Sequence, residues 1–197
     1  LRGLVAGVAS ADSWATDAHK WLNVPYDSGL AFVRDTQVHR AALARNAAYL
    51  QRSEDGRDNY EWVSEFSRRA RGFAVYAALR SLGRKGVVDL VDRSCAHARR
   101  FAALLSAVPG VRVLNDVVLN QVLVRFQSPA SAGESAERDD AWTREVIARV
   151  QREGTCWLSG TVWHGATAMR ISISNWSTTG EDIERSYRAI VAAHAAG

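Results

Sequence analysis

The chain has 197 residues, of which 47% are hydrophobic and 23% are charged, and its net charge is +4. These proportions are those of a globular protein and exclude a chain that is mainly disordered. The charge is too small to indicate a nucleic-acid-binding protein. Two cysteines are too few for a disulfide framework and lie outside any zinc-ligand spacing, and no apolar run is long enough to span a bilayer. We therefore expect a cytoplasmic protein with no metal centre and no nucleic-acid or membrane partner.

The first part of the chain combines few strands with helical and polar segments. In chain order we expect the end of a helix (residues 1–10) and two strands joined by a tight irregular connection (14–22 and 29–33). A helix (36–50), a polar loop (51–59) and another helix (64–82) follow. These strands are too few to close a sheet of their own. Because the chain also opens on Leu1, we expect it to be a piece of a longer protein.

The second part alternates helices and strands in a regular order. Hydrophobic periodicity predicts a helix over residues 87–105 and two strands over residues 111–114 and 119–126. A helix over 142–154, two strands over 155–163 and 167–174 and a last helix over 178–191 follow. The last helix begins where Thr178 and Glu181 have the spacing of a capping box. We expect an α/β domain with helices on one side of a mainly antiparallel sheet. A hinge over residues 83–86 separates this domain, residues 84–197, from residues 1–83.

Lysine is rare in this sequence and stands out for that reason. Of the 25 basic residues two are lysines, Lys20 and Lys85. Lys20 lies between a histidine and a tryptophan and follows Asp17 by three residues. A lysine amine can lose its proton and attack a carbonyl carbon, which an arginine cannot do. Lys20 is therefore a candidate Schiff-base lysine, and a simple surface lysine is the alternative.

The residues around Lys20 carry a resemblance to a known family. Residues 17–22, Asp-Ala-His-Lys-Trp-Leu, resemble the cofactor-lysine motif of the group II pyridoxal-phosphate-dependent amino-acid decarboxylases. The agreement continues in the family's order through residues 23–29, 67–71, 78–83, 169–172, 175 and 178–179. The resemblance implies the fold-type I, pyridoxal-phosphate-dependent transferase-like fold. Residues 1–83 would then end the large cofactor-binding domain, and residues 84–197 would form the small C-terminal α/β domain.

The resemblance also implies roles for particular residues. Lys20 would hold pyridoxal 5'-phosphate covalently, with His19 and Asp17 beside the cofactor and its phosphate. The alternative role of His19 and Asp17 is to fix the loop by local hydrogen bonds. Tyr49, ahead of the polar loop, would return a proton to the substrate carbon after carbon dioxide leaves, although a tyrosine here can equally anchor the loop. Arg170 faces the polar side of its strand and could bind a substrate carboxylate or make a structural ion pair.

The expected activity is decarboxylation of an L-amino acid to an amine and carbon dioxide by a homodimeric enzyme. The family's pyridine-binding Asp and much of its phosphate site precede the lysine and are absent here, so we expect these 197 residues alone to be inactive. Two alternatives stay open. One is another fold-type I enzyme, such as an aminotransferase, a carbon-sulfur lyase or an aldehyde synthase, and the other is a non-catalytic dimerisation or anion-binding module.

The basic run of Arg68, Arg69 and Arg71 is the one feature that could indicate RNA binding. Ion pairs with Glu61 or Glu65 are the simpler explanation for these arginines.

Overall fold

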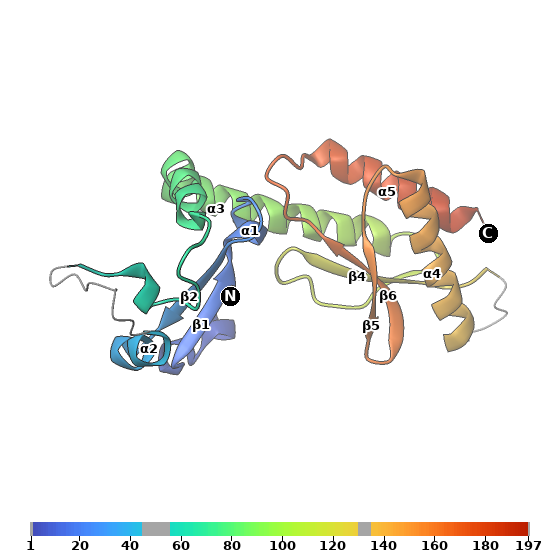
Figure 1. The fold of residues 1–197 in the computed structure, drawn as a ribbon. Coiled ribbons are helices and arrows are strands. Elements are labelled where there is room, and N and C mark those ends of the chain that lie inside the picture. Colours follow the sequence, from blue (N-terminus) through green and yellow to red (C-terminus); the bar gives the residue numbers. More distant parts are fainter. Residues whose placement is uncertain (1, 45–55, 130–134, 197) are drawn as a thin grey trace. The chain divides into compact units, whose positions relative to one another are not determined.

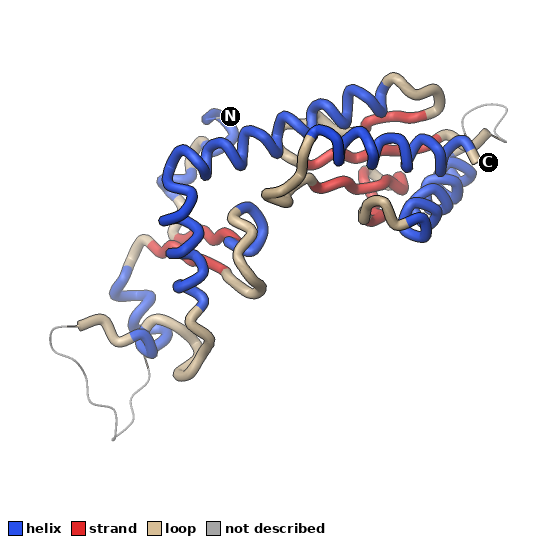
Figure 2. The backbone as a smooth tube through the Cα atoms, turned by 90° about the horizontal axis from the view of Figure 1, so that it is seen from above, coloured by secondary structure: helices blue, strands red, loops and turns tan. Residues whose placement is uncertain are grey.

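The structure is a computed structural model that describes residues 2–44, 56–129 and 135–196 (Figures 1 and 2). The chain divides into two compact units, Leu1–Leu82 and Gly83–Gly197. The boundary falls within α3 (Arg71–Ser106), where Gly83 adopts φ 60° and ψ −179° and interrupts the helical backbone. A positive φ at this position is accessible to glycine at little steric cost. Two helical runs, residues 71–82 and 84–106, therefore belong to different units.

The first unit is built on a two-stranded antiparallel sheet. Its elements are the 3-10 helices η1 (Arg2–Val5) and η2 (Val8–Ser10), β1 (Ser13–Asp17), α1 (Ala18–Trp21), β2 (Gly29–Val33), α2 (Thr36–Leu43), η3 (Asn59–Glu61) and the start of α3. Strand β1 pairs with β2 so that Asp17 lies opposite Gly29. A small cluster of Ala18, Val24 and Val75 packs α1 and the residues that follow it against α3. This cluster fixes the position of α1 at the end of β1.

The second unit contains the expected alternation of helices and strands. After α3 come β3 (Val111–Val113), β4 (Gln121–Phe126), α4 (Ala136–Glu153), β5 (Ser159–Trp163), β6 (Ala166–Ser172) and α5 (Gly180–Ala195). The strands form one antiparallel sheet in the order β3-β4-β6-β5. The β5–β6 hairpin turns through His164 and Gly165, both with positive φ, as a two-residue loop of type I′ requires.

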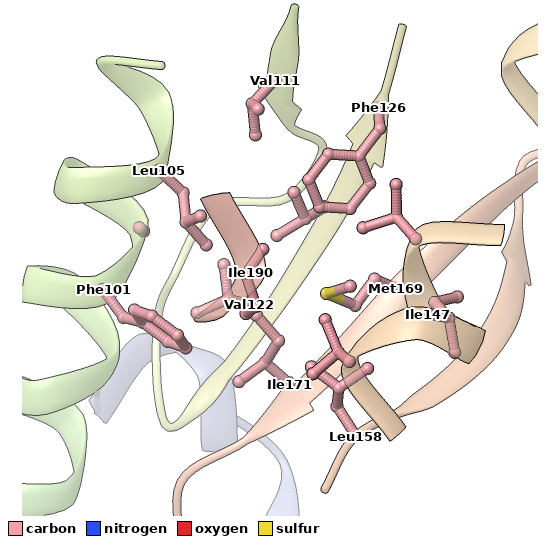
Figure 3. Close-up of a cluster of buried hydrophobic side chains, with 14 of the residues drawn as sticks. Phe101, Leu105, Val111, Val122, Phe126, Ile147, Leu158, Met169, Ile171 and Ile190 are labelled. Carbon is pink, nitrogen blue, oxygen red and sulfur yellow. The ribbon is translucent and has the colours of Figure 1, made fainter. Parts of the chain in front are cut away.

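One hydrophobic core joins the three helices of this unit to its sheet. Figure 3 shows Phe101 and Leu105 of α3, Ile147 of α4 and Ile190 of α5 meeting the inward side chains of the strands. Along β4 and β6 the core residues alternate and include Val122, Val124, Phe126, Met169 and Ile171, and the pattern continues to Ile173, just after β6. The period of two in the sequence therefore predicted which face of the sheet is buried.

Several details differ from the sequence-based expectations. Residues 2–10 contain two 3-10 helices rather than the end of an α-helix, and Gly7, at φ 85°, lies between them. The strand expected over residues 14–22 ends at Asp17, where α1 begins. The helix expected from residue 142 begins at residue 136, and the strand expected from residue 155 begins at residue 159. The helix expected from residue 64 begins at Arg71. The capping box of the last helix uses Thr179 and Asp182, one residue later than expected. Within the described part of the chain, none of the helices is long and apolar enough to cross a membrane.

Candidate active site

Lys20 lies on a single helical turn that directly follows a strand. Strand β1 ends at Asp17, whose backbone is still extended, and α1 begins at the next residue. The turn ends because Asn23 takes a left-handed conformation at φ 52°. Its side-chain amide donates to the carbonyl oxygens of Lys20 and Trp21, at 3.0 and 3.3 Å. Asparagine is one of the few residues that favour this helix-ending geometry.

Lys20 and Asp17 form an ion pair across this strand-to-helix junction. The distance from Lys20 Nζ to Asp17 Oδ2 is 2.5 Å. The Lys20 side chain is 64% exposed and that of Asp17 is 38% exposed, so the amine is accessible within its unit. The hydrogen bond from Lys20, aided by the positive charge of Lys20, holds the pKa of the Asp17 carboxyl below its usual value, although desolvation acts in the opposite direction. The pair therefore places an accessible amine beside a stable negative charge.

His19 is oriented by the segment that returns to the sheet. The backbone N–H of Ser28 lies 3.1 Å from His19 Nδ1, and the Ser28 carbonyl already accepts the N–H of Ala18 at 2.8 Å. His19 Nδ1 lies 3.1 Å from the Ser28 carbonyl oxygen as well. Because the Ser28 N–H can only donate, we assign Nδ1 as its acceptor, which leaves the proton of the neutral imidazole on Nε2. The Tyr26 ring packs against the imidazole with centroids 4.1 Å apart. His19 thus carries a fixed ring with an N–H donor at Nε2.

The structure unites some of the expected site residues but not all. Lys20, His19 and Asp17 lie together at the junction of β1 and α1. Tyr49 lies outside the described residues. Arg170 belongs to β6 of the second unit, where its side chain is exposed and its Nε donates to Gln121 Oε1 at 3.4 Å. Arg170 therefore keeps a polar, accessible position on its strand.

The sequence-based expectation for the basic run is confirmed only in part. Arg71 forms a bidentate ion pair with Asp27, at 2.7 and 3.1 Å, and its distance to Glu65 is 4.0 Å. Glu61 instead binds Arg40 at 2.7 Å. No local pattern could have predicted the Arg71–Asp27 pair, because its partners are 44 residues apart in the sequence.

The comparison with protein families assigns the chain to a class. Residues 1–127 match the family described as the pyridoxal-dependent decarboxylase conserved domain. The match covers most of the chain and includes the whole β1–α1 junction. The chain therefore belongs to the pyridoxal-dependent decarboxylases.

Individual relatives agree with this assignment. The chain is 25% identical to histidine decarboxylase of Mus musculus, over 96% of the chain and 28% of that protein. It is 23% identical to phenylacetaldehyde synthase of Arabidopsis thaliana, over 96% of the chain and 39% of that protein. The crystal structure of Oryza sativa TDC with PLP and tryptamine superposes with a TM-score of 0.91 at 23% identity, covering 99% of this chain and 41% of that one. The chain thus spans well under half the length of these proteins and shares their fold.

The donor groups at the β1–α1 junction suit the cofactor of the family. Pyridoxal phosphate is an aldehyde, and aldehydes attach to primary amines. Lys20 supplies the one lysine amine of the first unit, and its 64% exposure leaves that amine reachable. Asp17 and His19 add a carboxylate and an imidazole N–H beside it. The described residues contain no cluster of three or more metal-ligating side chains.

The ion pair predicts a specific acid titration. We expect the Asp17 carboxyl to titrate at lower pH in the native chain than in a Lys20→Ala variant, because Lys20 stabilises the charged form. Since the folded-state pKa is depressed, the interaction is complete above the ordinary carboxyl pKa and is lost as the pH falls through the folded value. Carboxyl ¹³C chemical shifts measure both midpoints. Equal midpoints in the two proteins would show that the pair does not form in solution.

Proposed function

We propose that the protein carrying this chain is a pyridoxal-phosphate-dependent decarboxylase that converts an L-amino acid to an amine and carbon dioxide. The observation that carries this proposal is the accessible Lys20 amine, held at 2.5 Å from Asp17 within the residues that match the family. Support for the substrate class comes from relatives such as mouse histidine decarboxylase. In this proposal residues 1–83 complete the cofactor-binding domain and residues 84–197 form the small C-terminal domain.

Each residue of the junction has a distinct task in this mechanism. Pyridoxal phosphate, when bound, supplies an electron-withdrawing ring that accepts the electron pair of the bond broken at the substrate carbon. Lys20 would hold the cofactor through Nζ, and its amine would take or give a proton at that atom. Asp17 keeps Nζ at the end of β1. His19 presents Nε2–H as a fixed donor because Ser28 occupies Nδ1.

Two further residues complete the proposed chemistry. Tyr49 would donate its phenolic proton to the substrate carbon after carbon dioxide has left, which makes the product an amine. The Arg170 guanidinium would bind a carboxylate of the substrate, for which its planar donors are suited. Its exposed position on β6 and its long contact with Gln121 leave its remaining donors available for such a role.

An aldehyde-forming reaction is the second candidate, because the chain is also similar to phenylacetaldehyde synthase of Arabidopsis thaliana. Tyr49 favours simple decarboxylation in our proposal, since a proton donor at this step yields the amine. Product analysis with a panel of L-amino acids separates the reactions. We expect equimolar amine and carbon dioxide without ammonia. Release of ammonia and aldehyde would instead identify a synthase, and no turnover of any amino acid by the cofactor-loaded protein would indicate a non-catalytic module.

We also propose that the protein carrying this chain is a homodimer, as the family resemblance implies, and that it is cytoplasmic, because its two cysteines are too few for a disulfide framework. Sedimentation equilibrium of the cofactor-loaded protein would test the oligomeric state. A mass of two subunits is expected, and a monomer that still turns over substrate would refute the dimer.

A further inference from the structure

The connection from α1 to β2, residues 22–28, is held by two arginines that come 43 and 44 residues later in the chain. Arg71 donates from Nε to Asp27 Oδ1 at 2.7 Å and from Nη2 to Oδ2 at 3.1 Å. Arg69 donates from Nη1 to the carbonyl oxygen of Tyr26 at 2.5 Å. A bidentate arginine-carboxylate pair fixes orientation as well as distance. Arg71, the first residue of α3, and Arg69, just before the helix, thus hold Asp27 and Tyr26.

The residues on either side of Asp27 bind the helix that bears Lys20. Tyr26 packs on the imidazole of His19, and the Ser28 N–H donates to its Nδ1 at 3.1 Å. The Ser28 carbonyl also accepts the N–H of Ala18, the first residue of α1, at 2.8 Å. A helix of four residues has too few internal hydrogen bonds to hold its own shape. The direction of α1, and with it that of Lys20, therefore depends on the connection.

We propose that Arg71 is a positioning residue for Lys20: by binding Asp27 it fixes the connection against which α1 and His19 pack. This inference rests on the proposed role of Lys20 in holding the cofactor. The Arg71–Asp27 pair is partly solvent-exposed, with side chains 31% and 64% exposed, and exposed pairs add little to global stability. We therefore expect loss of the pair to change the position of α1 more than the global stability of the protein.

The first measurement needs no cofactor. In the cofactor-free protein carrying this chain, Arg71→Gln should speed hydrogen exchange at the amides of Ala18 and Ser28 severalfold, because both donate across the connection. Arg100→Gln is the matched control, since Arg100 makes a similar exposed pair with Glu184 in the second unit. It should leave both exchange rates unchanged. Unchanged rates in Arg71→Gln would overturn the proposal, as would a uniform loss of protection across both units.

The second measurement uses the cofactor-loaded protein. Because a small misplacement of a catalytic group is costly, kcat of Arg71→Gln should fall about ten- to a hundredfold with a smaller change in KM. Arg71→Lys keeps the charge but loses the bidentate geometry and should recover part of the loss. The double variant Arg71→Gln/Asp27→Asn should be no slower than the slower single variant, because both changes remove one contact. Multiplicative losses would show that Arg71 and Asp27 act separately and would overturn the inference.

Failure of this inference is distinguishable from failure of the proposed function. If Lys20 does not hold the cofactor, Arg71→Gln still loosens the amides of Ala18 and Ser28, while no cofactor is found on Lys20. If Arg71 does not position α1, the cofactor attaches to Lys20 and neither amide responds to Arg71→Gln. The two readouts therefore report on separate claims.

Discussion

Replacing Lys20 by arginine should abolish cofactor attachment and lower turnover by about 10³-fold or more, because covalent attachment and proton transfer by the amine are both lost. Arginine keeps the positive charge next to Asp17, so the fold of the β1–α1 junction should survive. A loss of turnover in Lys20→Arg would then come from the missing amine and not from unfolding. Steady-state turnover and the visible absorbance of the loaded protein measure the two effects.

The chain offers a matched control for this substitution. Lys85 is the other lysine of the sequence and lies in α3, beyond Gly83. Lys85→Arg should keep both cofactor attachment and turnover. A Lys20→Arg protein that retains most of the turnover of the unaltered protein would show that another group holds the cofactor.

The largest stability effect is expected from Arg125, whose side chain is 9% exposed. Arg125 forms a very short ion pair with Asp140 and donates from Nη2 to the Ala136 carbonyl at 2.8 Å. Asp140 also accepts the Thr167 N–H at 3.0 Å. Arg125→Leu leaves the carboxylate without its cation and should lower the free energy of unfolding of the second unit by about 3 kcal/mol. Hydrogen exchange at the slowest amides of β4 and β6 measures this loss.

The pH dependence of this effect has a defined sign. Partial burial alone would raise the pKa of Asp140, but the hydrogen bonds from Thr167 and the charge of Arg125 lower it overall. The stabilisation by the pair is therefore complete above the ordinary carboxyl pKa and is lost as the pH falls through the depressed folded value. The difference between the native chain and Arg125→Leu should accordingly shrink in acid.

A control and a double variant complete this test. Arg100→Gln removes an exposed pair and should cost less than about 1 kcal/mol. Replacing Arg125 and Asp140 together by leucine should cost less than the sum of the single changes, because no charge is then left uncompensated. Additive losses would mean that the two side chains do not act as a pair.

The second unit could be predicted from the sequence in most of its elements because its periodicities are strong. Alternation over Met169, Ile171 and Ile173 identified the buried face of β6 and of the residue after it, and all three belong to the hydrophobic core, where Figure 3 shows Met169 and Ile171. The error at the last helix has a local cause. Thr178 and Thr179 are adjacent, and either has a carboxylate three residues later, so spacing could not decide between them.

The first unit was harder to predict because long-range contacts override its local preferences. Residues 64–70 have helical spacing, but the structure begins the helix at Arg71, where Arg69 and Arg71 hold the connection between α1 and β2. Such long-range contacts also explain why only part of the candidate site could be predicted from the sequence. The Asp17–Lys20 pair spans three residues and was within reach of sequence reasoning, whereas the Arg71–Asp27 pair spans 44 residues.

Borohydride reduction of the cofactor-loaded protein, followed by peptide mass spectrometry, tests most directly whether Lys20 holds the cofactor. Reduction makes the link between an aldehyde and an amine permanent, so the modified residue can be identified. We predict one phosphopyridoxyl group per chain, located on Lys20, and none on Lys85. An unmodified Lys20 in protein that has bound the cofactor, or a label on Lys85, would contradict the account.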